Sequence, residues 1–180
     1  MSKYPYRQDR EELRELLQQY DNLKTGRSHS FIEEDSFEKI IDYFDDKDEL
    51  VQALEATDYA VNQYPYSASL LIKRADLLIS AKKYKEALYI LERAEALDSS
   101  DINLYILKTD AYLALDQQEK AAFVLEAALN YFIGDEKIEL LFELTDVYDD
   151  YENFDKVFDC LKMILEMDSN NEEALYKICF

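Results

Sequence analysis

His29 is the only histidine of the 180-residue chain, and it lies in a polar stretch at residues 26–30. A lone histidine in such a stretch is more often a solvated or capping side chain than a general base. Catalysis needs a positioned nucleophile, base or metal, and neither of the two glycines belongs to a Gly-rich loop that could cradle a phosphate. We therefore predict no catalytic residue, no cofactor and no enzymatic activity.

Two acidic clusters, residues 45–49 and 149–152, are the candidates for metal binding. They lack the glycine and the alternating ligands of a calcium loop, and acidic side chains near a helix start also favour the helix dipole. We predict no metal site, with a divalent-cation protein as the alternative. Cys160 and Cys179 have no CxxC spacing and are expected to be two buried, unreactive thiols.

Charge limits the class of partner. The chain holds 20 Lys and Arg against 40 Asp and Glu, a formal net charge of −20, which repels nucleic acid and anionic membrane surfaces. Hydrophobic residues make up 48% of the chain, and its mean hydropathy is −0.41. No run approaches the roughly 18 apolar residues of a membrane span, and residues 1–14 have no secretory signal. The expected location is cytoplasmic.

An internal period of 34 residues organises the chain. With only two Gly and two Pro, the composition favours helices with short connections. Three columns repeat with a step of 34, and a fourth copy follows after a step of 36: Phe37, Leu71, Tyr105 and Leu141; Ala53, Ala87, Ala121 and Val157; Ala60, Ala94, Ala128 and Ile164. We place the two added residues in the connection at residues 134–137.

Each copy reads as two amphipathic helices joined by a short turn. In residues 68–101, Leu71, Ala75 and Leu78 lie on one helical face. Small residues such as Ala87 are expected where neighbouring helices cross closely. This unit resembles the tetratricopeptide repeat (TPR), on the residues Leu71, Ala75, Leu78, Tyr84, Ala87, Leu91 and Ala94, with Pro65 closing the copy before. The resemblance implies an all-α, right-handed solenoid of antiparallel helix hairpins.

The repeat divides the chain into a cap and a solenoid. Residues 1–33 do not fit the period, and we predict one helix at residues 10–23 that covers the first repeat. The repeats are predicted at 34–67, 68–101, 102–137 and 138–171, with a partial copy at 172–180. Stopping at Phe180 leaves half a hairpin, which suggests an N-terminal fragment of a longer repeat protein or completion by a second chain.

The resemblance further implies that the first helix of every hairpin lines a concave groove that binds ligands. One column of its outward positions is pure aspartate: Asp42, Asp76, Asp110 and Asp146. It is a ligand-contacting strip, a solvated face or a set of inter-repeat hydrogen bonds, and Lys39 and Lys73, three residues before Asp42 and Asp76, are close enough to neutralise them along the helix. Family members that clamp carboxylates use Lys, Arg and Asn, whereas Glu38 and Asp42 stand here. The predicted groove residues are Asp42, Ile72, Asp76, Ile79, Ile106, Asp110, Leu113, Phe142 and Asp146.

These observations predict an interaction scaffold that binds a protein or peptide. An acidic groove with an apolar middle suits a basic peptide or helix with apolar anchors. The alternative is a structural module that self-associates through its C-terminal end, by Leu175, Ile178 and Phe180. Neither hypothesis involves nucleic acid, a membrane or a cofactor.

Overall fold

A computed structural model describes the backbone of residues 5–27 and 31–179. His29 and Phe180 lie outside the described residues. The described part contains ten α-helices and no strand: α1 Pro5–Lys24, α2 Glu34–Asp45, α3 Leu50–Gln63, α4 Ala68–Ser80, α5 Tyr84–Leu97, α6 Ile102–Leu113, α7 Gln118–Ala128, α8 Gly134–Asp150, α9 Phe154–Met167 and α10 Glu172–Ile178. None of these helices is both long and apolar enough to cross a membrane.

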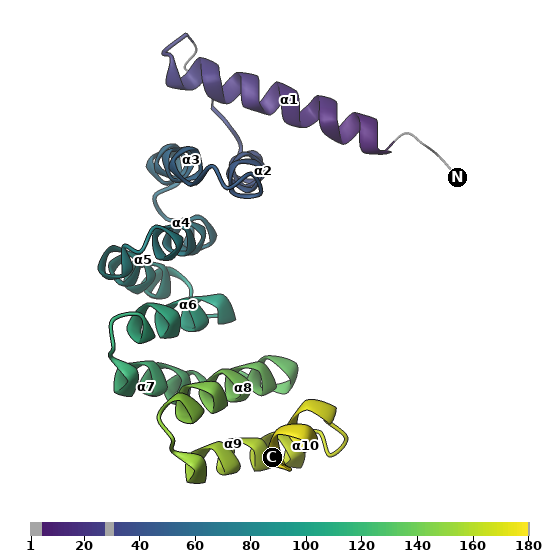
Figure 1. Ribbon diagram of the computed structural model, residues 1–180. Helices are drawn as coiled ribbons and strands as arrows, with labels where there is room; N and C mark the ends of the chain where they lie inside the picture. Colours follow the sequence, from purple (N-terminus) through teal and green to yellow (C-terminus); the bar gives the residue numbers. More distant parts are fainter. Residues whose placement is uncertain (1–4, 28–30, 180) are drawn as a thin grey trace.

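The helices from α2 onward stack as hairpins in a single curved column (Figure 1). Each helix packs against its neighbours in sequence, and the first helices of consecutive hairpins also touch, α4 with α6 and α6 with α8. The contacts therefore run from one hairpin to the next, as in a quasi-one-dimensional repeat array. The all-α solenoid predicted from the period is confirmed.

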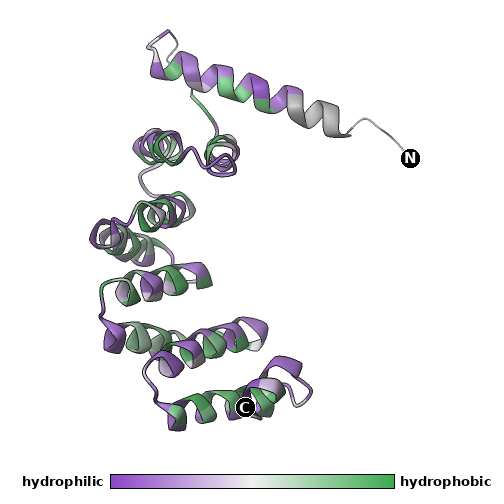
Figure 2. Ribbon diagram, in the orientation of Figure 1, coloured by the Kyte–Doolittle hydropathy of each residue, from purple (hydrophilic) through white to green (hydrophobic). Residues whose placement is uncertain are grey.

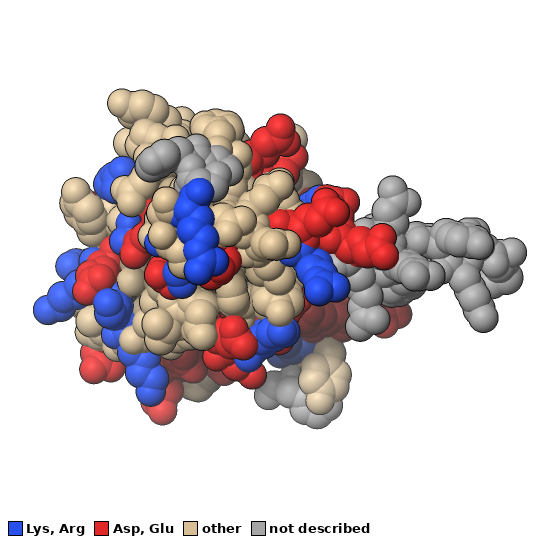
Figure 3. All heavy atoms as spheres, turned by 90° about the horizontal axis from the view of Figure 1, so that it is seen from above, with Lys and Arg blue, Asp and Glu red and all other residues tan. Residues whose placement is uncertain are grey.

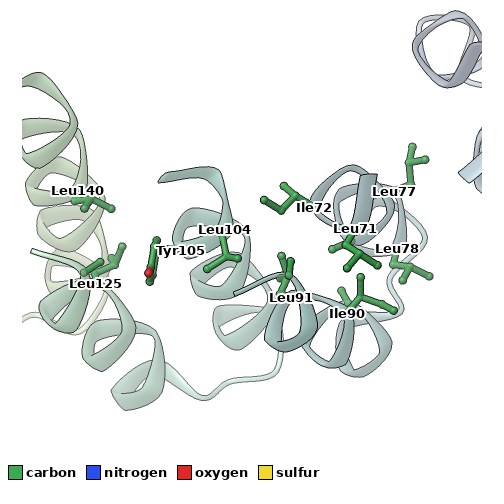
Figure 4. Packing of buried hydrophobic residues seen from close by; sticks show 14 of the residues in the cluster. Leu71, Ile72, Leu77, Leu78, Ile90, Leu91, Leu104, Tyr105, Leu125 and Leu140 are labelled. Atoms are coloured by element: carbon green, nitrogen blue, oxygen red, sulfur yellow. The ribbon is translucent and has the colours of Figure 1, made fainter. Parts of the chain in front are cut away.

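Buried apolar residues join the hairpins into one continuous core. Each helix carries both hydrophobic and hydrophilic residues along its ribbon (Figure 2), and Leu71 of α4 faces Ile90 and Leu91 of α5 (Figure 4). The alanines of the two small-residue columns are fully buried: Ala53, Ala87, Ala121, Ala60, Ala94 and Ala128. A methyl group at these positions lets neighbouring helix axes approach closely.

The turn inside each hairpin ends with a residue in the left-handed region. Asp48, Lys82, Asp116 and Glu152 have φ between 55° and 59°. In each case the next residue donates its backbone N–H to the carbonyl five residues earlier, such as Lys83 to Leu78 at 2.8 Å. This is a Schellman C-cap, which usually employs glycine. The same backbone closure thus forms in all four hairpins with side chains that give no sequence signal for it.

Helix α1 covers the first hairpin with its C-terminal half. Tyr20 is 2% exposed and packs edge-on against Tyr59 of α3, with ring centroids 5.8 Å apart, and near Phe44 of α2. Lys24 forms an ion pair with Glu55 of α3. The helix is longer than predicted, because it begins at Pro5 and ends at Lys24.

The two residues added in the third step are spread over three elements. Helix α8 begins at Gly134 and spans 17 residues, whereas α4 and α6 span 13 and 12. Its start lies four residues before the position that the period gives, α7 ends three residues early at Ala128, and the connection at residues 129–133 is one residue longer than those at 64–67 and 98–101. The prediction that residues 134–137 are a lengthened connection is therefore wrong, because they form the first turn of α8, where Gly134 has φ 62°.

Enlarging a fully buried alanine tests the close helix crossing. Ala87→Leu should lower the melting temperature by about 3–8 °C, because overpacking typically costs about 1–3 kcal/mol, while far-ultraviolet circular dichroism keeps its helical shape. Ala96→Leu is the matched control, since Ala96 is exposed on the same helix α5. Equal melting temperatures for the two variants would contradict the crossing.

Candidate functional site

The nine predicted groove residues lie on the first helices of the hairpins, α2, α4, α6 and α8. A cleft of about 460 Å³ opens between these helices, with Ile72 and Asp76 of α4 and Ile106 and Leu107 of α6 in its lining, together with Glu38 of α2. The other lining residues are Ser69, Lys73, Asp101 and Asn103. An apolar floor with charged walls can hold a side chain that is apolar along its stem and charged at its tip.

The remaining predicted residues extend this surface in both directions. Asp42 lines a second cavity, of about 530 Å³, between α1 and α2, which it shares with Glu12, Lys39 and Tyr43. Ile79, Leu113 and Phe142 are partly buried against the core, and Asp110 and Asp146 are exposed. The structure therefore brings Ile72, Asp76 and Ile106 into one cleft and leaves the other six outside it.

The aspartate column is electrostatically connected along the stack. Burial raises the pKa of Asp76, and the charge of Asp45 raises it further. Although the Asp110 side chain is exposed, neighbouring atoms remove part of its hydration, and this desolvation and then the charge of Asp76 raise its pKa. Burial, Asp110 and Asp146 raise the pKa of Glu143. The column repels itself most in the middle, where several carboxylates share a partly desolvated surface.

A second column, three residues before the aspartates, decides which of them is neutralised. It reads Lys39, Lys73, Leu107, Glu143 and Lys177 in successive hairpins. Lys73 pairs with Asp42, and Lys177 pairs with Asp146 at 2.6 Å, 31 residues away in sequence. A lysine in this column thus reaches back to the aspartate of the preceding hairpin.

The pairing of Lys73 differs from the predicted pairing within one helix. We expected Lys73 to neutralise Asp76, three residues on. Its ammonium instead bonds Asp42, because the stacked hairpins bring a carboxylate of the neighbouring helix within reach. Lys39, at the start of the column, bonds Glu12 of α1 at 2.6 Å. The signal that sequence reasoning missed is the 31-residue spacing, one repeat less about one helical turn.

The middle of the column lacks such a lysine. The positions that would serve Asp76 and Asp110 are Leu107 and Glu143. Within residues 11–27 and 31–179, no lysine or arginine nitrogen lies within the 4.0 Å of an ion pair from either aspartate. Two ion pairs therefore border a central stretch in which neither aspartate forms an ion pair, although the nearby charge of Lys73 lowers the pKa of Asp76. This stretch lies next to the apolar floor of the cleft.

Other candidate chemistry is sparse. In the part of the chain that the structure describes, no three His, Cys, Asp or Glu side chains are grouped so that they could hold a metal ion. Cys160 is buried, and burial raises the pKa of its thiol to about 11, so it is protonated at neutral pH. The expectation that both thiols are buried is wrong for Cys179, which is exposed on the last helical turn.

Comparisons with known proteins give a family and a fold. Residues 39–138 match the family ChAPs, described as Chs5p-Arf1p-binding proteins. No curated protein is similar enough to count as a relative.

Three solved structures share the fold. Kinesin light chain TPR-like repeats of Podospora anserina are 15% identical over 93% of this chain and 92% of that one, with a TM-score of 0.72. A TPR protein of Thermus thermophilus is 15% identical over 94% and 96%, with a TM-score of 0.67. YrrB, a TPR protein with an unusual peptide-binding site, is 18% identical over 79% and 73%, with a TM-score of 0.60. The chain has the TPR fold, as the 34-residue period predicted.

Restoring the missing lysine tests the charge arrangement. Glu143→Lys should lower the pKa of Asp110, measured by carboxyl NMR titration, because a lysine in this column reaches back to the preceding aspartate. A carboxyl whose pKa is higher in the folded than in the unfolded state makes the folded protein less stable as the pH rises from its ordinary pKa through the raised one. The variant should remove that loss and raise the melting temperature at pH 7 by up to about 4 °C.

Glu143→Gln is the control, since it removes one repulsive charge without supplying a cation. It should give about half of the effect. An unchanged pKa of Asp110 in the lysine variant would contradict the assignment of this column.

Proposed function

Because the chain belongs to the ChAPs family, the Chs5p-Arf1p-binding proteins, we propose that it is a non-enzymatic scaffold that holds a segment of a partner protein in its concave groove. The segment carries Lys or Arg together with apolar anchors. Its binding involves no covalent step and rests on complementary shape and charge.

The observation that carries this proposal is that Asp76 and Asp110, beside the apolar floor, form no ion pair with a described lysine or arginine. The fold partly desolvates these carboxylates and gives them no ion pair. A ligand that brings a cation therefore gains binding free energy from a charge-assisted hydrogen bond. Ile72 and Ile106 lie in the same cleft as Asp76, so an apolar side chain can anchor the ligand next to its charge. A helix that presents both kinds of side chain on one face matches this arrangement.

Named partners and a related fold support a peptide or protein ligand. The family is described by its binding of Chs5p and Arf1p, so these two proteins are the first partners to test. YrrB, which has the same fold, is described as having an unusual peptide-binding site.

A second candidate function is self-association through α10. Leu175 is 43% exposed, whereas Ile178, the second predicted residue, is partly buried against the core. A second copy could cover this face. Phe180, which we also predicted to take part, lies outside the described residues.

Neutralising the central aspartates tests groove binding. A fluorescein-labelled peptide with alternating lysine and leucine should bind in an anisotropy titration, and more weakly as salt rises. Asp76→Asn with Asp110→Asn should weaken it about tenfold, because two charge-assisted contacts are lost. The control with the same charge change is Glu92→Gln with Glu119→Gln, on exposed positions of α5 and α7. Binding insensitive to salt, or equal losses in the two double variants, would contradict the groove.

Light scattering after size exclusion tests self-association. If α10 joins two copies, Leu175→Ser with Tyr176→Ser should convert dimers into monomers while the lysine and leucine peptide still binds. A wild-type monomer at about 100 μM would exclude this second candidate.

A further inference from the structure

A cavity of about 430 Å³ on the other side of the second hairpin is lined by basic residues. Arg74 and Leu78 of α4 and Lys85, Tyr89 and Arg93 of α5 contribute to it, with Glu86 and Ile90. Successive residues of a helix are about 100° apart, so Arg74 lies on the side of α4 opposite Ile72 and Asp76. The cavity is therefore separate from the groove.

Three of the lining residues form a stripe along α5. Lys85, Tyr89 and Arg93 are four residues apart, which places them one above another on one helical face, and Tyr89 is 63% exposed. The matching positions of the other hairpins, by the 34 and 36 steps, do not repeat this stripe: Val51, Glu55 and Tyr59; Glu119, Phe123 and Ala127; Asp155, Asp159 and Met163. A basic stripe is a feature of this hairpin and not a requirement of the repeat.

Two of the three cations in this cavity have no acidic partner among the described residues. Arg74 donates to Asp58 of α3 through one terminal nitrogen at 2.7 Å, but its Nε is buried and has no hydrogen-bond partner in the described structure. Lys85 and Arg93 have no acidic partner within 4.0 Å among the described residues. Glu86 pairs with Lys83 at 3.7 Å. Lys85 and Arg93 can therefore each form a charge-assisted hydrogen bond with an anionic ligand.

We propose that this cavity, the α5 basic pocket, binds a short acidic segment of a partner protein. Carboxylates of the segment lie between Arg74, Lys85 and Arg93, with one accepting from a terminal guanidinium nitrogen of Arg74, whose side chain is 28% exposed. An apolar side chain between these carboxylates packs on Tyr89 and Ile90. This site has the opposite charge preference to the groove.

The distribution of charge favours a short segment over an extended polyanion. Lys and Arg gather along the side of the molecule on which α5 lies in Figure 1 (Figure 3), but the whole chain carries 40 acidic and 20 basic residues. A nucleic acid or an anionic membrane would extend beyond this hairpin and meet net negative charge. A few carboxylates fit within the Debye length of about 8 Å at physiological ionic strength, so the rest of the surface does not exclude them.

The test uses a fluorescein-labelled peptide in which glutamates flank a central leucine, at physiological ionic strength. Its binding should be saturable by anisotropy, and ¹H–¹⁵N NMR should place the shifted amides on α5 and around Arg74. Lys85→Glu with Arg93→Glu should weaken binding at least tenfold. Lys120→Glu with Lys162→Glu, the same charge change on exposed lysines of α7 and α9, should change it less than twofold.

Two further variants separate this site from others. Arg74→Lys keeps the charge but removes the second terminal nitrogen of the guanidinium, which can serve the ligand while the first holds Asp58. It should weaken the peptide several-fold while circular dichroism and melting temperature confirm folding. Asp76→Asn with Asp110→Asn should leave it unchanged, so failure of the groove does not decide this site.

Four outcomes would overturn the proposal. The first is the absence of saturable amide shifts on α5. The second is an equal loss of peptide affinity in the Lys85→Glu, Arg93→Glu variant and the Lys120→Glu, Lys162→Glu variant. The third and fourth are amide shifts on α5 with inorganic phosphate, or with phosphatidylserine vesicles, in the absence of shifts with the glutamate peptide.

Discussion

Close contact at methyl-sized side chains is the constraint on which the rest of the structure depends. Ala53, Ala87 and Ala121 are fully buried one repeat apart, and methyl-sized side chains there let the packed helix axes approach closely. A larger side chain at one of them would separate two helix axes and tilt every hairpin beyond it. Because the spacing is constant, residues 34 positions apart form straight columns, and a column can act as one surface.

The columns explain why ion pairs form at the two ends of the groove and not in its middle. A lysine three residues before each aspartate lies beside the aspartate of the preceding hairpin, so Lys73 and Lys177 each neutralise one carboxylate. Replacing that lysine by Leu107 and Glu143 costs stability at Asp76 and Asp110 without changing the backbone. A solenoid tolerates this, since its stability is a sum over repeats and their interfaces and a penalty in one hairpin stays local. Local conflict of this kind is expected at functional sites.

Much of the fold could be predicted because a period repeats the same information several times. The columns of Ala87 and of Asp76 are visible without coordinates, and so is the amphipathic face of Leu71. The partner of Lys73 could not be predicted, since the pattern within one helix favours Asp76 and only the stacking of two hairpins brings Asp42 nearer. The left-handed residue at Lys82 gave no signal either, because tertiary packing and the backbone bond of Lys83 impose it on a side chain that does not prefer it.

The α5 basic pocket could not be predicted from the sequence for a related reason. Arg74 occupies a position where the repeat usually has leucine, and sequence reasoning places such a side chain with its stem on apolar surface and its head in water. In the structure Asp58 holds the head at 2.7 Å and the protein covers Nε. At the matching position of the next hairpin, Lys108 is only 7% exposed and pairs with Glu95, so its ammonium has an anionic partner. Both cations thus have an anionic partner from a neighbouring helix, but only Arg74 keeps a buried donor without an acceptor. Periodicity identifies what repeats share, whereas binding chemistry arises where one repeat departs from the others.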